Sequence, residues 1–82
     1  MLKNIYVIRD YKVGYTNLVL DLNDAVAVRG FKSVLTPDSL QYNNPKDFAL
    51  FKVGTFDTET GIIEPFEPML VEEAYNLMPK GE

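Results

Sequence analysis

The stretch that decides the fold runs from Pro45 to Gly61 and reads PKDFALFKVGTFDTETG. Between Phe48 and Phe56 its side chains alternate with the period-2 pattern of a β-strand, and large apolar groups fall on both faces. A strand that is apolar on both faces is expected at the centre of a sheet. Asp57 and Gly61 favour a turn after it, because Asp can bond back to the backbone and Gly accepts a positive φ. We expect the chain to fold back there as a β-hairpin.

The first twenty residues contain a second hairpin signal. The segments 2–9 (LKNIYVIR) and 15–20 (YTNLVL) are rich in the β-branched and aromatic residues that favour strands. Residues 10–14 between them have turn chemistry, with Asp first and Gly last. We therefore expect two antiparallel strands joined by this turn.

A single amphipathic helix is predicted between the two hairpins. Asn23 is suited to cap it, because its side-chain oxygen can accept from the free N–H groups of the first turn. From Asp24 to about Leu35 apolar residues recur with the spacing of one helix face. Gly30 lies inside this helix, where it costs about 1 kcal/mol relative to alanine, so we expect a close approach to the sheet there. The helix should end before Pro37, followed by a short helical turn through Leu40.

Two later segments leave alternatives open. The connection of about a dozen residues before the central strand is long enough to be functional, or Leu40 and Tyr42 simply pin it to the core. After the second hairpin, the two prolines in 64–68 exclude an interior strand. Residues 69–78 (MLVEEAYNLM) fit either a short C-terminal helix or an edge strand.

These elements predict an α+β fold in the order β-β-α-β-β. It consists of a small antiparallel sheet made of two hairpins, with one amphipathic helix packed on one face. We expect a single domain over 1–82, with a compact core at 1–64 and an acidic, proline-containing C-terminal segment at 65–82. The other face of such a sheet stays open and apolar, so it should meet a ligand or a partner subunit, and we expect a homodimer.

The composition argues against several classes of function. The chain contains no His and no Cys, the commonest catalytic bases, nucleophiles and transition-metal ligands. We therefore expect no enzyme activity, no metal site and no cofactor. No run of residues resembles a signal peptide or a membrane span, and we expect no membrane association.

The net charge of −4 is unevenly distributed along the chain. Residues 1–52 hold seven basic and five acidic groups, whereas residues 53–82 hold one basic and seven acidic groups. The first part is thus compatible with a nucleic-acid ligand. A protein that neutralises phosphates over its whole surface is excluded.

Aromatic and basic residues are interleaved on the first hairpin and the central strand. This combination binds single-stranded nucleic acid, because bases stack on the rings for about 1–3 kcal/mol each while Lys and Arg follow the backbone. The competing explanation is that core strands are commonly aromatic and turns commonly contain Lys. The candidate nucleic-acid-binding residues are Tyr6, Arg9, Tyr11, Lys12, Tyr15, Phe51 and Lys52.

Three segments resemble the small nonstructural protein of gokushoviruses, which are Microviridae phages with circular single-stranded DNA genomes. They are residues 5–15 (IYVIRDYKVGY), 23–31 (NDAVAVRGF) and above all 44–61, where Asp-Phe, an apolar-aromatic pair, Gly, aromatic-Asp and Thr-Gly follow one another. The resemblance covers most of residues 4–64 and is a signature of fold, not of catalysis. Gly30 departs from the family pattern, which usually has a better helix former at that place.

The resemblance implies a DNA-binding or single-strand-synthesis protein, made in the cytoplasm of the infected bacterium and absent from the virion. Our hypothesis adds that the aromatic and basic face holds nascent viral single strands. The acidic C-terminal region would then compete with DNA or recruit a replication partner.

The alternative is a protein-interaction module without DNA affinity that modulates a phage replication initiator or a host factor. DNA binding predicts that Arg9, Tyr11, Lys12 and Tyr15 lie together on an open surface. The alternative predicts an open face that is apolar or acidic.

Overall fold

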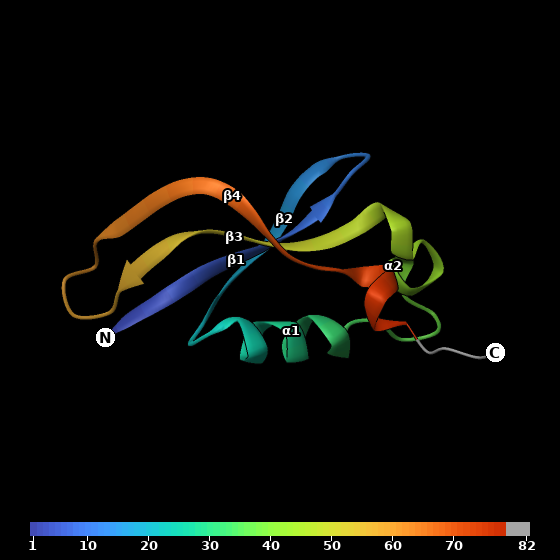
Figure 1. The fold of residues 1–82 in the computed structure, drawn as a ribbon, viewed down its shortest axis with the longest axis horizontal. Helices are drawn as coiled ribbons and strands as arrows, with labels where there is room; N and C mark the ends of the chain where they lie inside the picture. Colours follow the sequence, from blue (N-terminus) through green and yellow to red (C-terminus); the bar gives the residue numbers. More distant parts are fainter. Residues whose placement is uncertain (79–82) are drawn as a thin grey trace.

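In the computed structural model, which describes residues 1–78, four strands form one antiparallel sheet with a helix packed beneath it (Figure 1). The strands are β1 (Leu2–Asp10), β2 (Gly14–Asp21), β3 (Phe48–Asp57) and β4 (Ile63–Glu73), and their order in the sheet is β2-β1-β3-β4. The helices are α1 (Asp24–Ser33), α2 (Leu40–Asn43) and the 3-10 turns η1 (Pro45–Asp47) and η2 (Ala74–Leu77). The predicted α+β class and β-β-α-β-β order are confirmed.

Strand β3 lies inside the sheet, as its two apolar faces predicted. It pairs with β1 along its whole length and with β4 from Ala49 to Phe56. The two predicted hairpins are also present, because β1 pairs with β2 and β3 with β4, both antiparallel. Strands β2 and β4 are left as the edges of the sheet.

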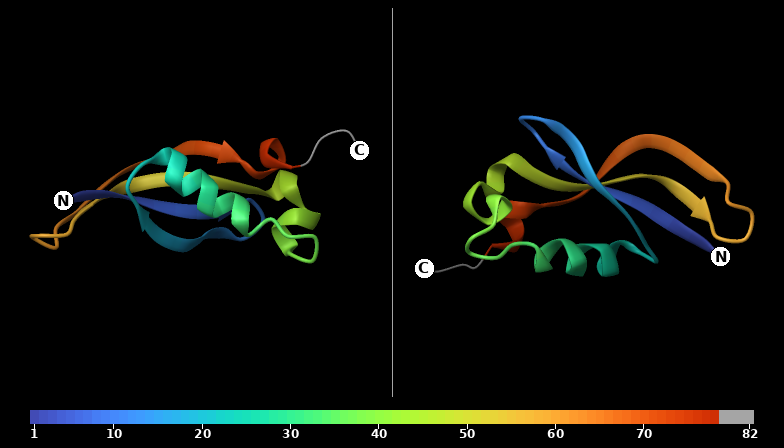
Figure 2. Two further views of the ribbon diagram at one scale, coloured as in Figure 1. Left: turned by 90° about the horizontal axis from the view of Figure 1, so that it is seen from below. Right: turned by 180° about the vertical axis from the view of Figure 1, so that it is seen from behind.

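Helix α1 covers one face of the sheet. Its N-terminus is capped as predicted, because the Val26 N–H donates to the Asn23 side-chain oxygen at 2.9 Å. Figure 2 shows α1 crossing the lower face of the strands. The core between helix and sheet consists of Tyr6, Ile8, Ala27, Phe31, Phe48, Leu50 and Ala74.

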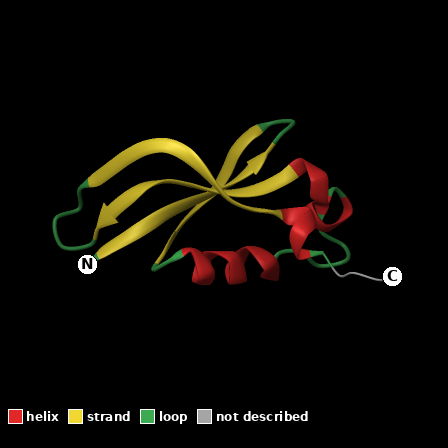
Figure 3. Ribbon diagram, in the orientation of Figure 1, coloured by secondary structure: helices red, strands yellow, loops and turns green. Residues whose placement is uncertain are grey.

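The opposite face of the sheet carries no helix of residues 1–78. In Figure 3 the helices lie below the sheet and at one end of it, and the upper side of the strands is free. We call this side the open face. None of the helices in the described part of the chain has the length and apolar composition that crossing a membrane requires.

Gly30 does not mark a close approach of α1 to the sheet, so that prediction was wrong. A Cβ atom at this position would meet no atom within 4 Å. The glycine instead borders a hollow of about 280 Å³ between α1 and β2, lined also by Val19 and Phe31. The helix therefore gains nothing sterically from this glycine.

The helical turn after Pro37 was predicted too early in the chain. The Ser39 side chain caps α2 by accepting from the Tyr42 N–H at 3.0 Å, so the helix starts only at Leu40. The hydroxyl of Thr36 donates to the Asp38 carboxylate instead. Of the two residues considered as loop anchors, Tyr42 is half-buried but Leu40 is exposed.

The alternative left open for residues 69–78 is settled in favour of an edge strand followed by one helical turn. Strand β4 continues to Glu73, and η2 then places Ala74 in the core. Pro65 lies opposite Gly54 on β3. A proline is tolerated there because β4 is an edge, where one side of the strand needs no ladder bond.

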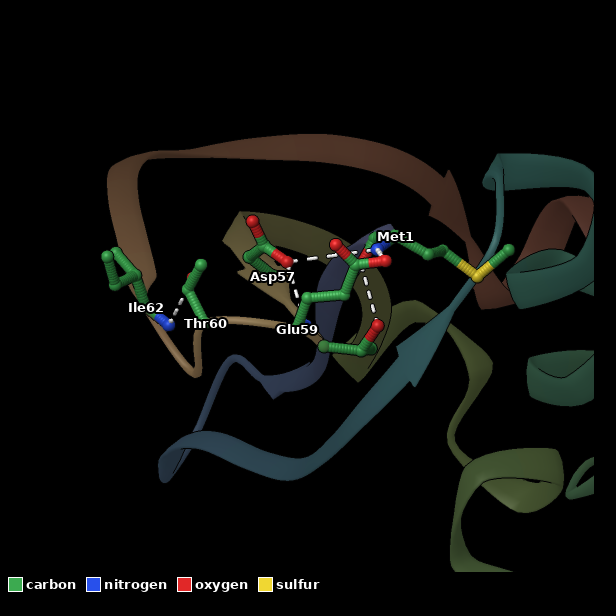
Figure 4. A network of polar contacts seen from close by, with 6 residues as sticks. Met1, Asp57, Glu59, Thr60 and Ile62 are labelled. Carbon is green, nitrogen blue, oxygen red and sulfur yellow. Dashed lines mark hydrogen bonds and ion pairs between the residues drawn. The ribbon is translucent and has the colours of Figure 1, made fainter.

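The turn between β3 and β4 is held against the N-terminus (Figure 4). The Met1 amine lies 3.7 Å from carboxylate oxygens of both Asp57 and Glu59. The Met1 carbonyl accepts from the backbone N–H of Thr58 at 2.9 Å and from its hydroxyl at 3.1 Å. The Glu59 N–H donates to Asp57 at 2.8 Å and is the main reason why the pKa of Asp57 lies below its ordinary value.

Candidate nucleic-acid interface

Four of the predicted site residues meet at one end of the open face. In the register of the sheet, Tyr15 on β2 lies opposite Arg9 on β1. Phe51 on β3 lies opposite Val7, which shares the face of Arg9 because side chains alternate along β1. Tyr11 follows β1 in the hairpin turn. We call Arg9, Tyr11, Tyr15 and Phe51 the Arg9 cluster.

The Arg9 cluster is ordered by contacts between its own side chains. The guanidinium carbon of Arg9 lies 4.6 Å from the centre of the Tyr15 ring and 5.5 Å from that of Tyr11. Both tyrosines meet the Phe51 ring edge-to-face, with centroids 5.8 Å apart for Tyr15 and 6.5 Å for Tyr11. Cation–π and edge-to-face contacts of this kind hold rings in place.

The cluster leaves part of its aromatic surface exposed, with a lysine exposed beside it. Tyr11 and Tyr15 are 44% and 46% exposed. Arg9 is half-buried, and its Nε atom is buried without a hydrogen-bond partner within residues 1–78. Lys12 is exposed beside the cluster in the hairpin turn, where its backbone N–H donates to the Asp10 carboxylate. The arrangement can therefore offer two ring surfaces and two cations to a flat, anionic ligand.

Tyr6 and Lys52 do not belong to this cluster, so their grouping with it was wrong. They lie opposite each other on β1 and β3, on the face covered by α1. The Tyr6 hydroxyl donates to the Asp24 carboxylate at 2.6 Å and accepts from the Asn4 side chain at 3.0 Å. Lys52 Nζ lies 3.2 Å from the same Asp24 oxygen. The two residues tie the start of α1 to the sheet.

The hydrogen bond between Tyr6 and Asp24 contributes to pKa shifts of both groups, in the directions that favour the folded state. Burial, followed by the bond to Asp24, raises the pKa of Tyr6 to about 12. The same bond is the main cause that lowers the pKa of Asp24 below its ordinary value, and Lys52 adds to it. Neutral Tyr6 and ionised Asp24 are therefore the forms that the fold stabilises.

A pH dependence at the alkaline side follows from Tyr6. Because its folded pKa is raised from about 10 to about 12, its contribution is complete below pH 10 and is lost between pH 10 and 12. Tyr6→Phe should cost about 1–2 kcal/mol of unfolding free energy at pH 8, through the lost hydrogen bond. Urea denaturation of both proteins should show this difference closing as the pH rises to 12. A difference that stays constant over that range would contradict the assignment.

Glu73 is a residue near the cluster that the sequence analysis missed. Ala49 on β3 lies opposite both Arg9 on β1 and Glu73 on β4, so Glu73 shares the face of Arg9. Together with burial, its charge raises the pKa of Tyr11, while Arg9 acts in the other direction. Only the register of β4, which the sequence left undecided, reveals this neighbour.

The other half of the open face is apolar. It forms a shallow hollow of about 470 Å³ with a lining contributed by all four strands and free of charged residues. We call it the apolar hollow, and it is lined by Ile5, Leu18, Leu20, Val53, Phe56, Ile63, Pro65 and Phe66. The open face thus carries the feature expected for DNA binding at one end and the feature expected for protein interaction at the other.

Neither half of the face offers the chemistry of a metal site. Residues 1–78 contain no group of three or more His, Cys, Asp or Glu side chains arranged to hold a metal ion. The polar groups that do converge, at Asp24 and at the Met1 amine, are occupied by the contacts described above.

The comparison with known protein families concerns nearly the whole fold. Residues 3–77 match the model of a family described as Phage ORF5 protein. The chain belongs to this family. It is accordingly a bacteriophage protein, and the matched range includes β2, β3, β4, α1 and all of β1 except Leu2. No curated protein and no solved structure matches the chain.

Proposed function

We propose that this phage protein binds single-stranded DNA during viral genome replication or single-strand synthesis. The observation that carries the proposal is the Arg9 cluster, in which two half-exposed tyrosine rings surround a guanidinium on the open face. The resemblance to the small nonstructural protein of gokushoviruses supports the same role. It also supports action in the cytoplasm of the infected bacterium and not in the virion.

In the proposed mechanism the aromatic rings bind the bases and the cations bind the phosphates. Bases stack on the exposed surfaces of Tyr11 and Tyr15, whose rings are held in place by edge-to-face contacts with Phe51. Arg9 and Lys12 attract the phosphates next to those bases. Every base has a flat face, so this mode of binding tolerates any sequence.

The charges around the cluster limit the affinity that this site can reach. Two cations give a salt dependence of log K against log salt of about −1.4, at about −0.7 for each phosphate contact. Glu73 on the same face opposes the phosphates. We therefore expect moderate affinity at low salt that falls only about fivefold when the salt concentration is raised threefold toward physiological values.

The proposal is tested by fluorescence anisotropy of a labelled oligothymidylate, titrated with the protein at several salt concentrations. Tyr15→Ala should weaken binding about tenfold, because one stacked base contributes about 1–3 kcal/mol. Arg9→Ala should weaken it and also reduce the salt dependence by about one phosphate contact. The matched control is Tyr75→Ala, since Tyr75 is 49% exposed but lies in η2, outside the cluster.

Two results would reject DNA binding at this site. One is the absence of binding at low salt up to roughly 100 μM protein, which is weak even for non-specific contacts. The other is a Tyr75→Ala variant that loses as much affinity as Tyr15→Ala does.

The second candidate function is a protein-interaction module that modulates a phage replication initiator or a host factor. The apolar hollow favours it, because exposed apolar patches mark interaction surfaces. Under this function, Tyr15→Ala would leave activity in the infected cell unchanged, whereas a charge placed in the hollow would abolish it.

A further inference from the structure

The apolar hollow lies in the half of the open face that DNA binding through the Arg9 cluster does not use. Its floor includes Ile5, which is only 5% exposed, whereas Leu18 on β2 and Ile63 on β4 are 66% and 59% exposed. Phe66 is 40% exposed beside them. Leaving such side chains in water forfeits about 25 cal/mol for each Å² of apolar surface.

We propose that the apolar hollow is the interface of a homodimer, in which two copies of this chain pack their open faces against each other. Face-to-face packing of two sheets, about 10 Å apart, is a common way to bury such surfaces. The helices α1 would then lie on the two outer sides of the assembly.

The size of the hollow fits a second copy of the chain. A large apolar side chain presents roughly 150–200 Å² when fully exposed, so the eight lining residues, of which five are exposed, two half-buried and one buried, present at most roughly 500 Å². Two copies would bury at most about 1,000 Å² in total through these residues, which is the lower limit for a specific interface. The dimer should accordingly dissociate at micromolar concentrations.

The distribution of charges also favours a second copy of the chain as the partner that packs on the hollow. Each chain has a net charge of −4, which opposes association in general. The hollow is lined by no charged residue, so two copies meet there without like charges in contact. Nucleic acid, by contrast, finds no cation in the hollow to compensate its phosphates.

The edges of the sheet are poorly suited to the alternative assembly by strand addition. Strand β4 contains Pro65 and Pro68, which lack the N–H that a further strand would need. On β2, Asn17 has a positive φ of 56°, which interrupts the extended edge. These edge features favour association through the face over strand addition.

The proposed dimer is compatible with DNA binding but does not depend on it. The Arg9 cluster and the hollow occupy opposite halves of the face. A two-fold axis that runs across the strands through the hollow overlaps only the apolar halves. The two Arg9 clusters then lie at opposite ends of the dimer, both uncovered.

Sedimentation velocity of the full chain from about 1 to 300 μM tests the proposal. The wild type should shift from monomer to dimer within this range. Leu18→Glu and Ile63→Glu should each weaken association at least tenfold, because an isologous interface buries every new carboxylate twice. The matched control is Leu40→Glu, since Leu40 is 63% exposed but lies on α2 and does not line the hollow.

Each outcome has a defined meaning, provided that circular dichroism shows the variants folded. A wild type that stays monomeric at 300 μM overturns the dimer, as does a Leu18→Glu and Ile63→Glu pair that still associates like the wild type. Equal loss in Leu40→Glu overturns the assignment to the hollow. If the protein is monomeric but binds the oligonucleotide, the dimer is refuted and DNA binding stands. If it is dimeric but binds no oligonucleotide, DNA binding is refuted and the dimer stands.

Discussion

Gly54→Ala is expected to lower the free energy of unfolding by about 3 kcal/mol, a large part of the total for a domain of this size. Gly54 lies between Ile5 on β1 and Pro65 on β4 in the register of the sheet. A Cβ atom there would come within 2.6 Å of the Glu64 carbonyl oxygen and 3.1 Å of the Pro65 Cα. Backbone atoms cannot rotate away as a side chain can, so β3 and β4 would have to separate.

The control for this prediction is the same substitution at Gly30. There the new Cβ meets no atom within 4 Å, and alanine is the better helix former by about 1 kcal/mol. Gly30→Ala should therefore stabilise the protein by about that amount. Urea denaturation of both variants at neutral pH measures the two effects. A Gly54→Ala variant as stable as the wild type would show that the strands approach less closely than described.

Phe31→Ala is expected to cost about 3–5 kcal/mol of unfolding free energy, which is the usual range for removing a buried phenylalanine. Phe31 is 3% exposed and packs in the core between α1 and the sheet. A hollow already lies beside Phe31, next to Gly30. Few neighbouring atoms can therefore move in to fill the cavity that removal of the ring would leave. Because α1 is the helix that covers this face, detachment of α1 should unfold the whole domain cooperatively.

The comparison for Phe31→Ala is Tyr75→Ala, which truncates an aromatic residue that is 49% exposed. That variant should change the unfolding free energy by less than about 1 kcal/mol, as surface substitutions usually do. Thermal and urea denaturation, followed by circular dichroism, give both values. Comparable losses in the two variants would contradict the placement of Phe31 in the core.

The local elements of the fold were predictable because their signals are local. The alternation around Phe51 predicted a strand that is apolar on both faces and central in the sheet, and the structure places β3 between β1 and β4. Asn23 predicted the start of α1 through its side-chain cap. Such features depend on residues that are close in the chain, so their chemistry can be read from the sequence.

The candidate site was only partly predictable. Alternation along β1 places Arg9 and Tyr6 on opposite faces of the sheet. The sequence alone therefore suffices to exclude a shared surface for these two residues. The meeting of Tyr11, Tyr15 and Phe51 around Arg9 requires three segments to lie side by side in a set register. The sequence indicated the residue types but not that register.

By itself the sequence determined the two hairpins, the helix with its cap, and the open face that a single helix cannot cover. The tertiary structure alone decided that Gly54, and not Gly30, is the glycine at a close approach. It alone also decided that β4 continues through two prolines and brings Glu73 to the cluster face. The physical reason is that these outcomes depend on the distance between strands far apart in the chain, which no local pattern encodes.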